Sequence, residues 1–142
     1  MNNNLFLIAE IGINHNGDIN LAKEMIDDAY KGDFDAVKFQ KRTVDLVYDK
    51  KFLDSYRKSP WGSTQREQKN GLEFSISQLK ELKDFSHERG LKFSASCWDT
   101  NAFNEMLEVG LDFHKIASPM NRHYELLELT AKTKTKTFIS TG

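Results

Sequence analysis

Five short apolar runs in the sequence each end in a polar residue, and this feature limits the possible folds more than any other. The runs span residues 5–10, 36–40, 92–96, 113–118 and 137–140. Their final polar residues are Glu10, Gln40, Ser96, Ser118 and Ser140. Lys38 and Lys115 also interrupt two of the runs, although Lys is almost never fully buried unless it is paired or functional. Polar residues at the carboxyl ends of successive parallel strands indicate one shared site, as in (β/α) barrels.

Helical patterns separate the apolar runs. Apolar spacings of three and four predict one helix after a cap at Asp18 or Asn20 and another over about residues 77–89. Two further helices are predicted to begin near residues 99–101 and after Asn121. Tyr30 and Leu107 are among the residues expected on the buried faces. Three of the four helices are expected to end at a glycine, left-handed in the case of the first, and these are Gly32, Gly90 and Gly110.

Strands that alternate with helices predict a parallel sheet with right-handed crossovers, hence an α/β fold. Four and a half βα units do not close a barrel, which needs eight units and about 250 residues, whereas a doubly wound sheet closes at this length. Ligand contacts in a doubly wound sheet gather mostly at one switch point, but here every strand ends in a polar residue. We therefore predict that residues 1–142 form one partial domain, the N-terminal half of a (β/α)8 TIM barrel, from its first strand to its fifth.

One connection is much longer than the others. It runs from Thr43 to Gly71, is rich in charged residues and contains the segment Ser59-Pro60-Trp61-Gly62. A long loop after a strand in this architecture is usually functional. We expect it to contribute to substrate selection.

Charge and cysteine content restrict the class of protein. Twenty basic and 21 acidic residues give a net charge of −1, which argues against a nucleic-acid or membrane partner. The single Cys97 excludes an intrachain disulfide and suggests a reducing compartment. Residues 1–4 lack the basic start of a signal peptide, and no run approaches the roughly 20 apolar residues of a membrane helix. We expect a cytoplasmic protein.

Strand alternation places several polar side chains on one face. Lys38 and Gln40 share a face, and Glu10 points to the same side as Ile8. Two lysines with nearby hydroxyl groups form a cradle for a phosphate or carboxylate, and a carboxylate beside them is suited to general acid–base work. The alternative is a Lys–Glu ion pair that only supports the fold, which is disfavoured because buried charge without function is costly. Ser96 and Ser140 are favoured as ligand contacts.

Other candidates stay open from the residues alone. Ser94 is either a core hydroxyl or a ligand contact. His15, in the turn after the first run, either contacts substrate or holds the turn. His114 alternates with Lys115 and is expected to pack against the helices. No pair of histidines has metal-binding spacing, and Cys97 lacks a base partner.

Four motifs, in order, resemble the N-acetylneuraminate (sialic acid) synthase family, which includes legionaminic and pseudaminic acid synthases and the spore-coat polysaccharide synthase group. The motifs occupy residues 8–17, 37–40, 115–118 and 140–142. The resemblance implies a (β/α)8 barrel that condenses phosphoenolpyruvate with the open-chain aldehyde of an N-acylated amino sugar. The products would be a nine-carbon 2-keto acid and phosphate.

The resemblance also implies roles for single residues. Glu10 matches an acidic residue at the reaction centre, and Gln40 matches a sugar contact. The positions that match phosphoenolpyruvate contacts are Lys38, Ser96, Lys115, Ser118 and Ser140. A divalent metal, Mn or Mg, would polarise the aldehyde, with its ligands outside these residues. The full-length family protein is expected to be a homodimer, and residues 1–142 alone are expected to be inactive.

Two other readings remain at this point. One is a different phosphoenolpyruvate-using barrel aldolase, of the deoxy-heptulosonate-phosphate type. The other is a non-catalytic half-barrel that dimerises or binds a sugar phosphate.

Overall fold

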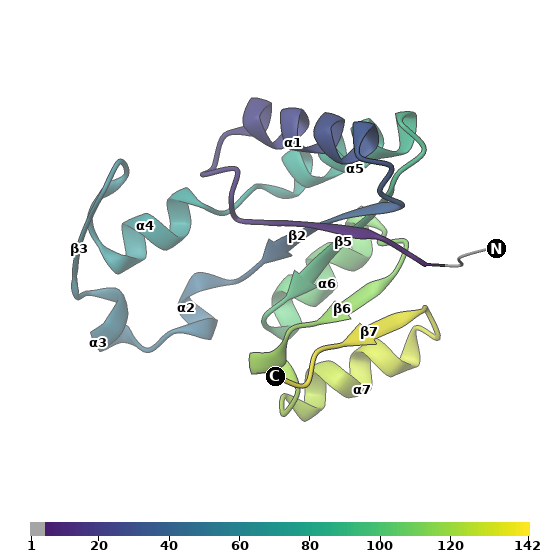
Figure 1. The fold of residues 1–142 in the computed structure, drawn as a ribbon. Helices are drawn as coiled ribbons and strands as arrows, with labels where there is room; N and C mark the ends of the chain where they lie inside the picture. Colours follow the sequence, from purple (N-terminus) through teal and green to yellow (C-terminus); the bar gives the residue numbers. More distant parts are fainter. Residues whose placement is uncertain (1–4) are drawn as a thin grey trace.

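A five-stranded parallel sheet forms the centre of the protein in a computed structural model that describes residues 5–142. The first four residues, where we noted no basic signal-peptide start, lie outside the described residues. The strands are β1 (Ile8–Gly12), β2 (Ala36–Lys41), β5 (Lys92–Cys97), β6 (His114–Ile116) and β7 (Thr137–Ile139). Figure 1 shows them side by side in this order, which is their order along the chain. The predicted sequential strand order is confirmed.

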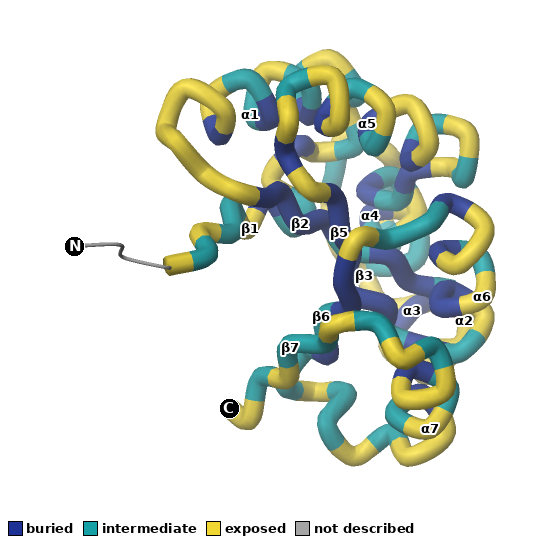
Figure 2. The backbone as a smooth tube through the Cα atoms, turned by 90° about the vertical axis from the view of Figure 1, so that its right-hand side faces the viewer, coloured by how far each residue is buried: buried dark blue, intermediate teal, exposed yellow. Residues whose placement is uncertain are grey.

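Four longer helices connect these strands, and they all lie on one side of the sheet (Figure 2). They are α1 (Ile19–Lys31), α5 (Ile76–Glu88), α6 (Thr100–Val109) and α7 (Tyr124–Lys132), and a short 3₁₀ turn η1 covers Ser118–Met120. A doubly wound sheet carries helices on both faces and places its first strand inside the sheet. Sequential strands with helices on one side instead form the first half of a (β/α)8 barrel.

The main core lies between the sheet and the helices. Val37 and Phe39 on β2 are fully buried there with Phe93 on β5. Ile26 and Leu82 cover them from α1 and α5. A smaller aromatic cluster lies on the other face of the sheet. The Phe6 ring stacks on the Phe138 ring, with their centres 6.0 Å apart, and meets the Phe113 ring edge-on, with centres 5.8 Å apart. Strand alternation therefore separates a helix-facing core from a barrel-facing surface.

The helix ends follow the predicted capping signals with one exception. Asp18 caps α1 through hydrogen bonds from the Asn20 and Leu21 amides. Gly90 and Gly110 adopt positive φ angles of 75° and 80° after α5 and α6. The prediction for Gly32 is wrong, because its φ is −84° and the left-handed residue is its neighbour Asp33, with φ 55°.

Two residues expected on buried faces are exposed. Tyr30 has 55% of its surface exposed and Leu107 has 47%. Tyr30 borders a surface hollow together with Glu88 and Arg89 at the end of α5 rather than lying in the core. Helical spacing alone does not separate the flank of an apolar face from its centre.

Residues 42–73, which we call the rim segment, are ordered rather than an irregular loop. They contain α2 (Val44–Val47), α3 (Lys50–Leu53), β3 (Tyr56–Ser59), β4 (Gly62–Thr64) and α4 (Gln65–Gly71). β3 and β4 form a separate antiparallel pair. Elements of three to seven residues are too short to show a clear hydrophobic period, so they were not predicted.

A close contact between glycines holds the rim segment to the turn after β1. A Cβ atom on Gly71 would overlap the indole ring of Trp61, and one on Gly17 would overlap the Gly71 carbonyl. Gly17 also has a positive φ of 71°. Trp61, Gly71 and Gly17 therefore form a stack, which we call the glycine latch, that allows no side chain at either glycine.

Candidate active site

Lys38 is the centre of a hydrogen-bonded group on the barrel-facing side of the sheet. Its Nζ lies 2.8 Å from Glu10 Oε2 on the neighbouring strand and 3.1 Å from Ser96 Oγ on the other side. It also donates to the Phe39 carbonyl at 3.2 Å. Lys38 is buried, whereas the Glu10 side chain is 56% exposed. The predicted convergence of these three side chains from β1, β2 and β5 is confirmed.

Lys115 and Ser140 form a second group on the same edge. Lys115 Nζ donates to Ser140 Oγ at 2.7 Å, and the strand register pairs Lys115 with Ser96. Partial burial lowers the pKa of Lys115; the positive charge of Lys38 lowers it further and the negative charge of Glu10 opposes this. The positive charges of the two lysines therefore repel each other at the carboxyl ends of the strands, which we call the barrel mouth. Together they offer two ammonium groups to an anionic ligand.

The other predicted site residues are placed less directly. Gln40 pairs with Ser96 in the register, and with its amide oxygen turned toward Arg42 it accepts from Nε and Nη1 at 3.2 Å each. Ser118 begins η1 after β6, and its hydroxyl group makes no hydrogen bond within residues 5–142. Ser94 is fully buried and donates to the Phe113 carbonyl at 2.7 Å, so it is a core hydroxyl.

Sequence reasoning missed Arg42 and the groups around it. Arg42 is only 4% exposed, its Nε lies 2.7 Å from Glu73 Oε1, and its Nη1 donates to the Tyr48 hydroxyl at 3.0 Å. The alternation that placed Lys38 and Gln40 on one face also includes position 42, so a signal was present. Its partner Glu73 is 31 residues away in the chain and carried no such signal.

Asp99 caps α6, where a helix start was predicted, but its contacts with Thr43 were missed. It lies in the loop after β5 and is buried. One oxygen accepts from the Thr43 amide at 2.7 Å, and the other accepts from the Thr43 hydroxyl at 2.9 Å and the Ala102 amide at 2.7 Å. This carboxylate therefore joins the start of the rim segment to the start of α6.

His15 holds the turn after β1. It is 1% exposed, its ring stacks on Phe74 at 4.1 Å, and its Nδ1 accepts from the Gly17 amide at 3.0 Å. Burial lowers the pKa of His15 to about 4 despite an opposing hydrogen bond with Gly12, so the ring is neutral at pH 7. Of the two readings left open, the geometry supports the structural one.

His114 and Cys97 take no part in the group around the lysines. His114 packs on the Phe103 ring, and its Nε2 lies 3.0 Å from Thr133 Oγ1, as its parity predicted. Cys97 is buried, and burial raises the pKa of its thiol to about 12. A thiol with so high a pKa is not a nucleophile at neutral pH.

The described residues do not themselves form a metal site. Within residues 5–142, no three His, Cys, Asp or Glu side chains gather closely enough to hold an ion. The same range contains no helix whose length and apolar character would let it cross a bilayer.

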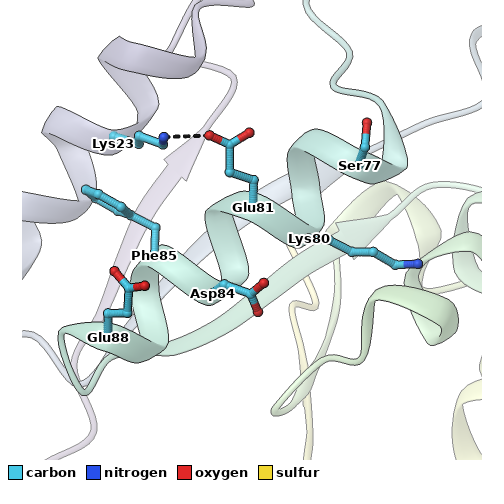
Figure 3. A pocket seen from close by; sticks show the side chains of 7 residues that line it. All are labelled: Lys23, Ser77, Lys80, Glu81, Asp84, Phe85 and Glu88. Atoms are coloured by element: carbon cyan, nitrogen blue, oxygen red, sulfur yellow. Dashed lines mark hydrogen bonds and ion pairs between the residues drawn. The ribbon is translucent and has the colours of Figure 1, made fainter.

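A groove on the outer surface is unrelated to this mouth. Figure 3 shows its lining residues along α5, with the Phe85 ring extending toward α1. The Nζ of Lys23 lies 2.6 Å from Glu81 Oε1 across it. Its charged groups come from the outward faces of two helices, away from the polar ends of the strands.

Comparison with known proteins places the chain in a family. The model of the family described as "NeuB family" matches residues 25–142, which is most of the chain. The chain belongs to the NeuB family. N-acetylneuraminate-9-phosphate synthase of Mus musculus is 40% identical over 139 residues, covering 96% of this chain and 39% of the mouse protein. N,N'-diacetyllegionaminic acid synthase of Legionella pneumophila is 34% identical over 140 residues, with the same coverage of 96% and 39%.

A solved structure of a NeuB-type protein is also similar. The N-acetylneuraminic acid synthetase of Leptospira borgpetersenii, crystallised with citrate, has a TM-score of 0.84 at 30% identity. The match covers 99% of this chain and 46% of that chain. The described residues therefore correspond to about half of a sialic acid synthetase barrel chain, and the chain spans about two fifths of the curated relatives.

Proposed function

We propose that this chain provides the phosphoenolpyruvate-binding half of a synthase that makes a nonulosonic acid. The substrates are phosphoenolpyruvate and the open-chain aldehyde of an N-acylated amino sugar. A carbon–carbon bond forms between the enol carbon of phosphoenolpyruvate and the aldehyde carbon, and the aldehyde oxygen takes up a proton. This step leaves a cation at the carbon that bears the phosphate. Water adds to that carbon and loses a proton, and phosphate then leaves to give the 2-keto acid.

The observation that carries this proposal is the pairing of two lysines from separate strands with hydroxyl groups and one carboxylate. Phosphoenolpyruvate is a small, highly charged anion, and Lys38 and Lys115 supply ammonium groups for its phosphate and carboxylate. Ser96 and Ser140 already hydrogen-bond these lysines and orient them. Because the lysine side chains are already oriented, less side-chain conformational entropy is lost when the anion binds.

Glu10 is suited to the proton transfers. Its carboxylate contacts Lys38 at 2.8 Å while more than half of its side chain stays exposed, so it is reachable by substrate and water. In this proposal Glu10 is the general acid–base group, Gln40 contacts the sugar, and Ser118 adds a hydroxyl for phosphoenolpyruvate. The divalent metal would polarise the aldehyde, but its ligands lie outside the residues described.

The test is an assay of the complete enzyme, by which we mean residues 1–142 joined to the remaining strands of a family barrel. Phosphate release and 2-keto acid formation are measured with phosphoenolpyruvate and an N-acetylated hexosamine, and each is also omitted in turn. We expect one phosphate for each 2-keto acid formed, and no product when either substrate is omitted. Phosphate release that does not need the sugar would contradict the proposal.

Glu10→Gln separates the chemical role of the carboxylate from its structural role. The substitution keeps the side-chain size and one hydrogen bond to Lys38 but removes the proton-transfer group. General acid–base catalysis contributes typically about 10²- to 10⁴-fold, so we expect a loss of that order in kcat. An unchanged kcat would show that Glu10 only pairs with Lys38.

A further inference from the structure

Arg42 lies at the start of the rim segment, directly after β2 (Figure 1). Strand alternation puts its side chain on the same face as those of Gln40 and Lys38. Gln40 pairs with Ser96 in the parallel register, and the Ser96 hydroxyl accepts a hydrogen bond from Lys38 at 3.1 Å. The Gln40 amide therefore lies between Arg42 and the group of side chains around Lys38.

The Arg42 guanidinium is held in place by contacts within the rim segment. Arg42 is only 4% exposed. One oxygen of Glu73 accepts from Arg42 Nε at 2.7 Å, and the other accepts from the Arg42 backbone amide at 3.1 Å. Arg42 Nη1 donates to the Tyr48 hydroxyl at 3.0 Å. A charge-assisted pair with so little exposure fixes the guanidinium before any ligand binds.

This guanidinium can only donate hydrogen bonds, whereas the Gln40 amide has one end that accepts and one that donates. With its oxygen toward Arg42, the amide accepts from Nε and Nη1 at 3.2 Å each. The opposite orientation would set N–H groups against N–H groups. Arg42 also has more N–H groups than acceptors, because its buried Nη2 has no partner among the described residues. Only the first orientation satisfies both side chains.

We infer that Arg42 is a positioning residue that turns the Gln40 amide so that its NH2 group faces the barrel mouth. The inference rests on the proposed function, in which Gln40 contacts the sugar. It adds the direction of that contact: Gln40 donates, and the sugar atom that it meets is an oxygen that accepts. Glu73 holds Arg42 in the position from which it acts.

Gln40→Glu tests the direction of the contact in the complete enzyme. The carboxylate has the same shape and still offers an oxygen to Arg42, but an oxygen replaces the NH2 group. An acceptor would then face the acceptor of the sugar, so we expect the KM for the N-acetylated hexosamine to rise about tenfold to a hundredfold. The KM for phosphoenolpyruvate should not change. An unchanged KM for the sugar would overturn the inference, because it would mean that Gln40 presents its oxygen.

Two substitutions of Arg42 test its positioning role. Arg42→Met removes the donors, so the Gln40 amide is free to turn and only part of the molecules present the NH2 group. The KM for the sugar should rise about twofold to tenfold. Arg42→Lys still carries only donors and should restore most of that loss, although both variants lose the paired contact with Glu73. In a Gln40→Ala background, Arg42→Met should not raise the KM for the sugar further.

Arg66→Met is the matched control. Arg66 also belongs to the rim segment and pairs with two carboxylates there, those of Asp45 and Asp54, but it does not contact Gln40. We expect it to leave both KM values unchanged. Equal KM values for the sugar in Arg42→Met and Arg42→Lys, or the same effect of Arg42→Met with and without Gln40, would make Arg42 a structural residue and overturn the inference.

Failure of the proposed function gives a different result, namely no 2-keto acid from the parent enzyme. The orientation of the amide is then measured in the 142-residue chain by NMR spectroscopy. The Gln40 side-chain signals are assigned by their loss in Gln40→Ala. A weak or absent nuclear Overhauser effect between the Gln40 NH2 group and the Arg42 Nε–H would support the orientation, and a strong one would overturn it.

Discussion

The buried His15 makes the stability of this chain depend on pH in a predictable way. Its pKa is about 4 in the folded state, against an ordinary value of 6.5, because burial disfavours the charged ring. Between these two values the unfolded chain binds a proton that the folded chain does not. The free energy of unfolding therefore falls as the pH is lowered from about 6.5 toward 4.

The size of the effect follows from the two pKa values. One pKa unit corresponds to about 1.4 kcal/mol, so the full loss below pH 4 is about 3 kcal/mol, and about 2 kcal/mol is already lost at pH 5. This is a large fraction of the 5–15 kcal/mol typical of a domain. Protonation would also cost Nδ1 its role as acceptor for the Gly17 amide, which holds the turn.

The assay is urea unfolding at pH 7 and at pH 5, for the parent chain and for His15→Asn. The asparagine oxygen can accept the Gly17 amide hydrogen but does not titrate. We expect the variant to be less stable at pH 7, because it loses the stacking on Phe74, yet to lose about 2 kcal/mol less than the parent on acidification. Burial also lowers the pKa of His114, and that contribution remains in both proteins. Equal pH dependence in the two proteins would refute the reasoning.

Three further substitutions test the mouth and its surroundings. In the complete enzyme, Lys115→Ala should raise the KM for phosphoenolpyruvate about tenfold to a hundredfold, with the exposed Lys132→Ala as control; an unchanged KM with lower stability would make Lys115 a structural residue. Gly71→Ala should destabilise the chain by about 1–3 kcal/mol in urea unfolding, because its Cβ overlaps Trp61, and Gly71→Ala with Trp61→Ala should recover part of that loss. Asp99→Ala leaves two amides and a hydroxyl without their buried acceptor and should cost about 2–4 kcal/mol; a loss below 0.5 kcal/mol would show that water replaces it.

The alternation of side chains along strands was enough to predict where most of the candidate side chains lie. Lys38, Ser96 and Lys115 could be placed on one face because parallel strands with sequential order bring equal parities to the same edge. Glu10 followed by the same rule, and all four meet within hydrogen-bond distance or in register. A rule of period two needs only a few residues, so short strands suffice for it.

The failures have a different origin. Glu73 and Asp99 act on Arg42 and Thr43 across 31 and 56 residues, and no local pattern encodes such partners. The elements of the rim segment are too short for a helical period. The left-handed residue after α1 is Asp33 rather than Gly32, and an aspartate also tolerates this conformation, so the presence of a glycine did not fix the position.

The glycine latch has a consequence for how enzymes of this architecture diversify. The rim segment forms its own hairpin and helices, and a stack of one tryptophan on two glycines presses it against the turn after β1. Exposed residues of this segment, such as those of β3, can therefore be exchanged without repacking the parallel sheet. Residues 42–73 therefore form a unit that can change by substitution while Lys38, Lys115 and Glu10 stay as they are.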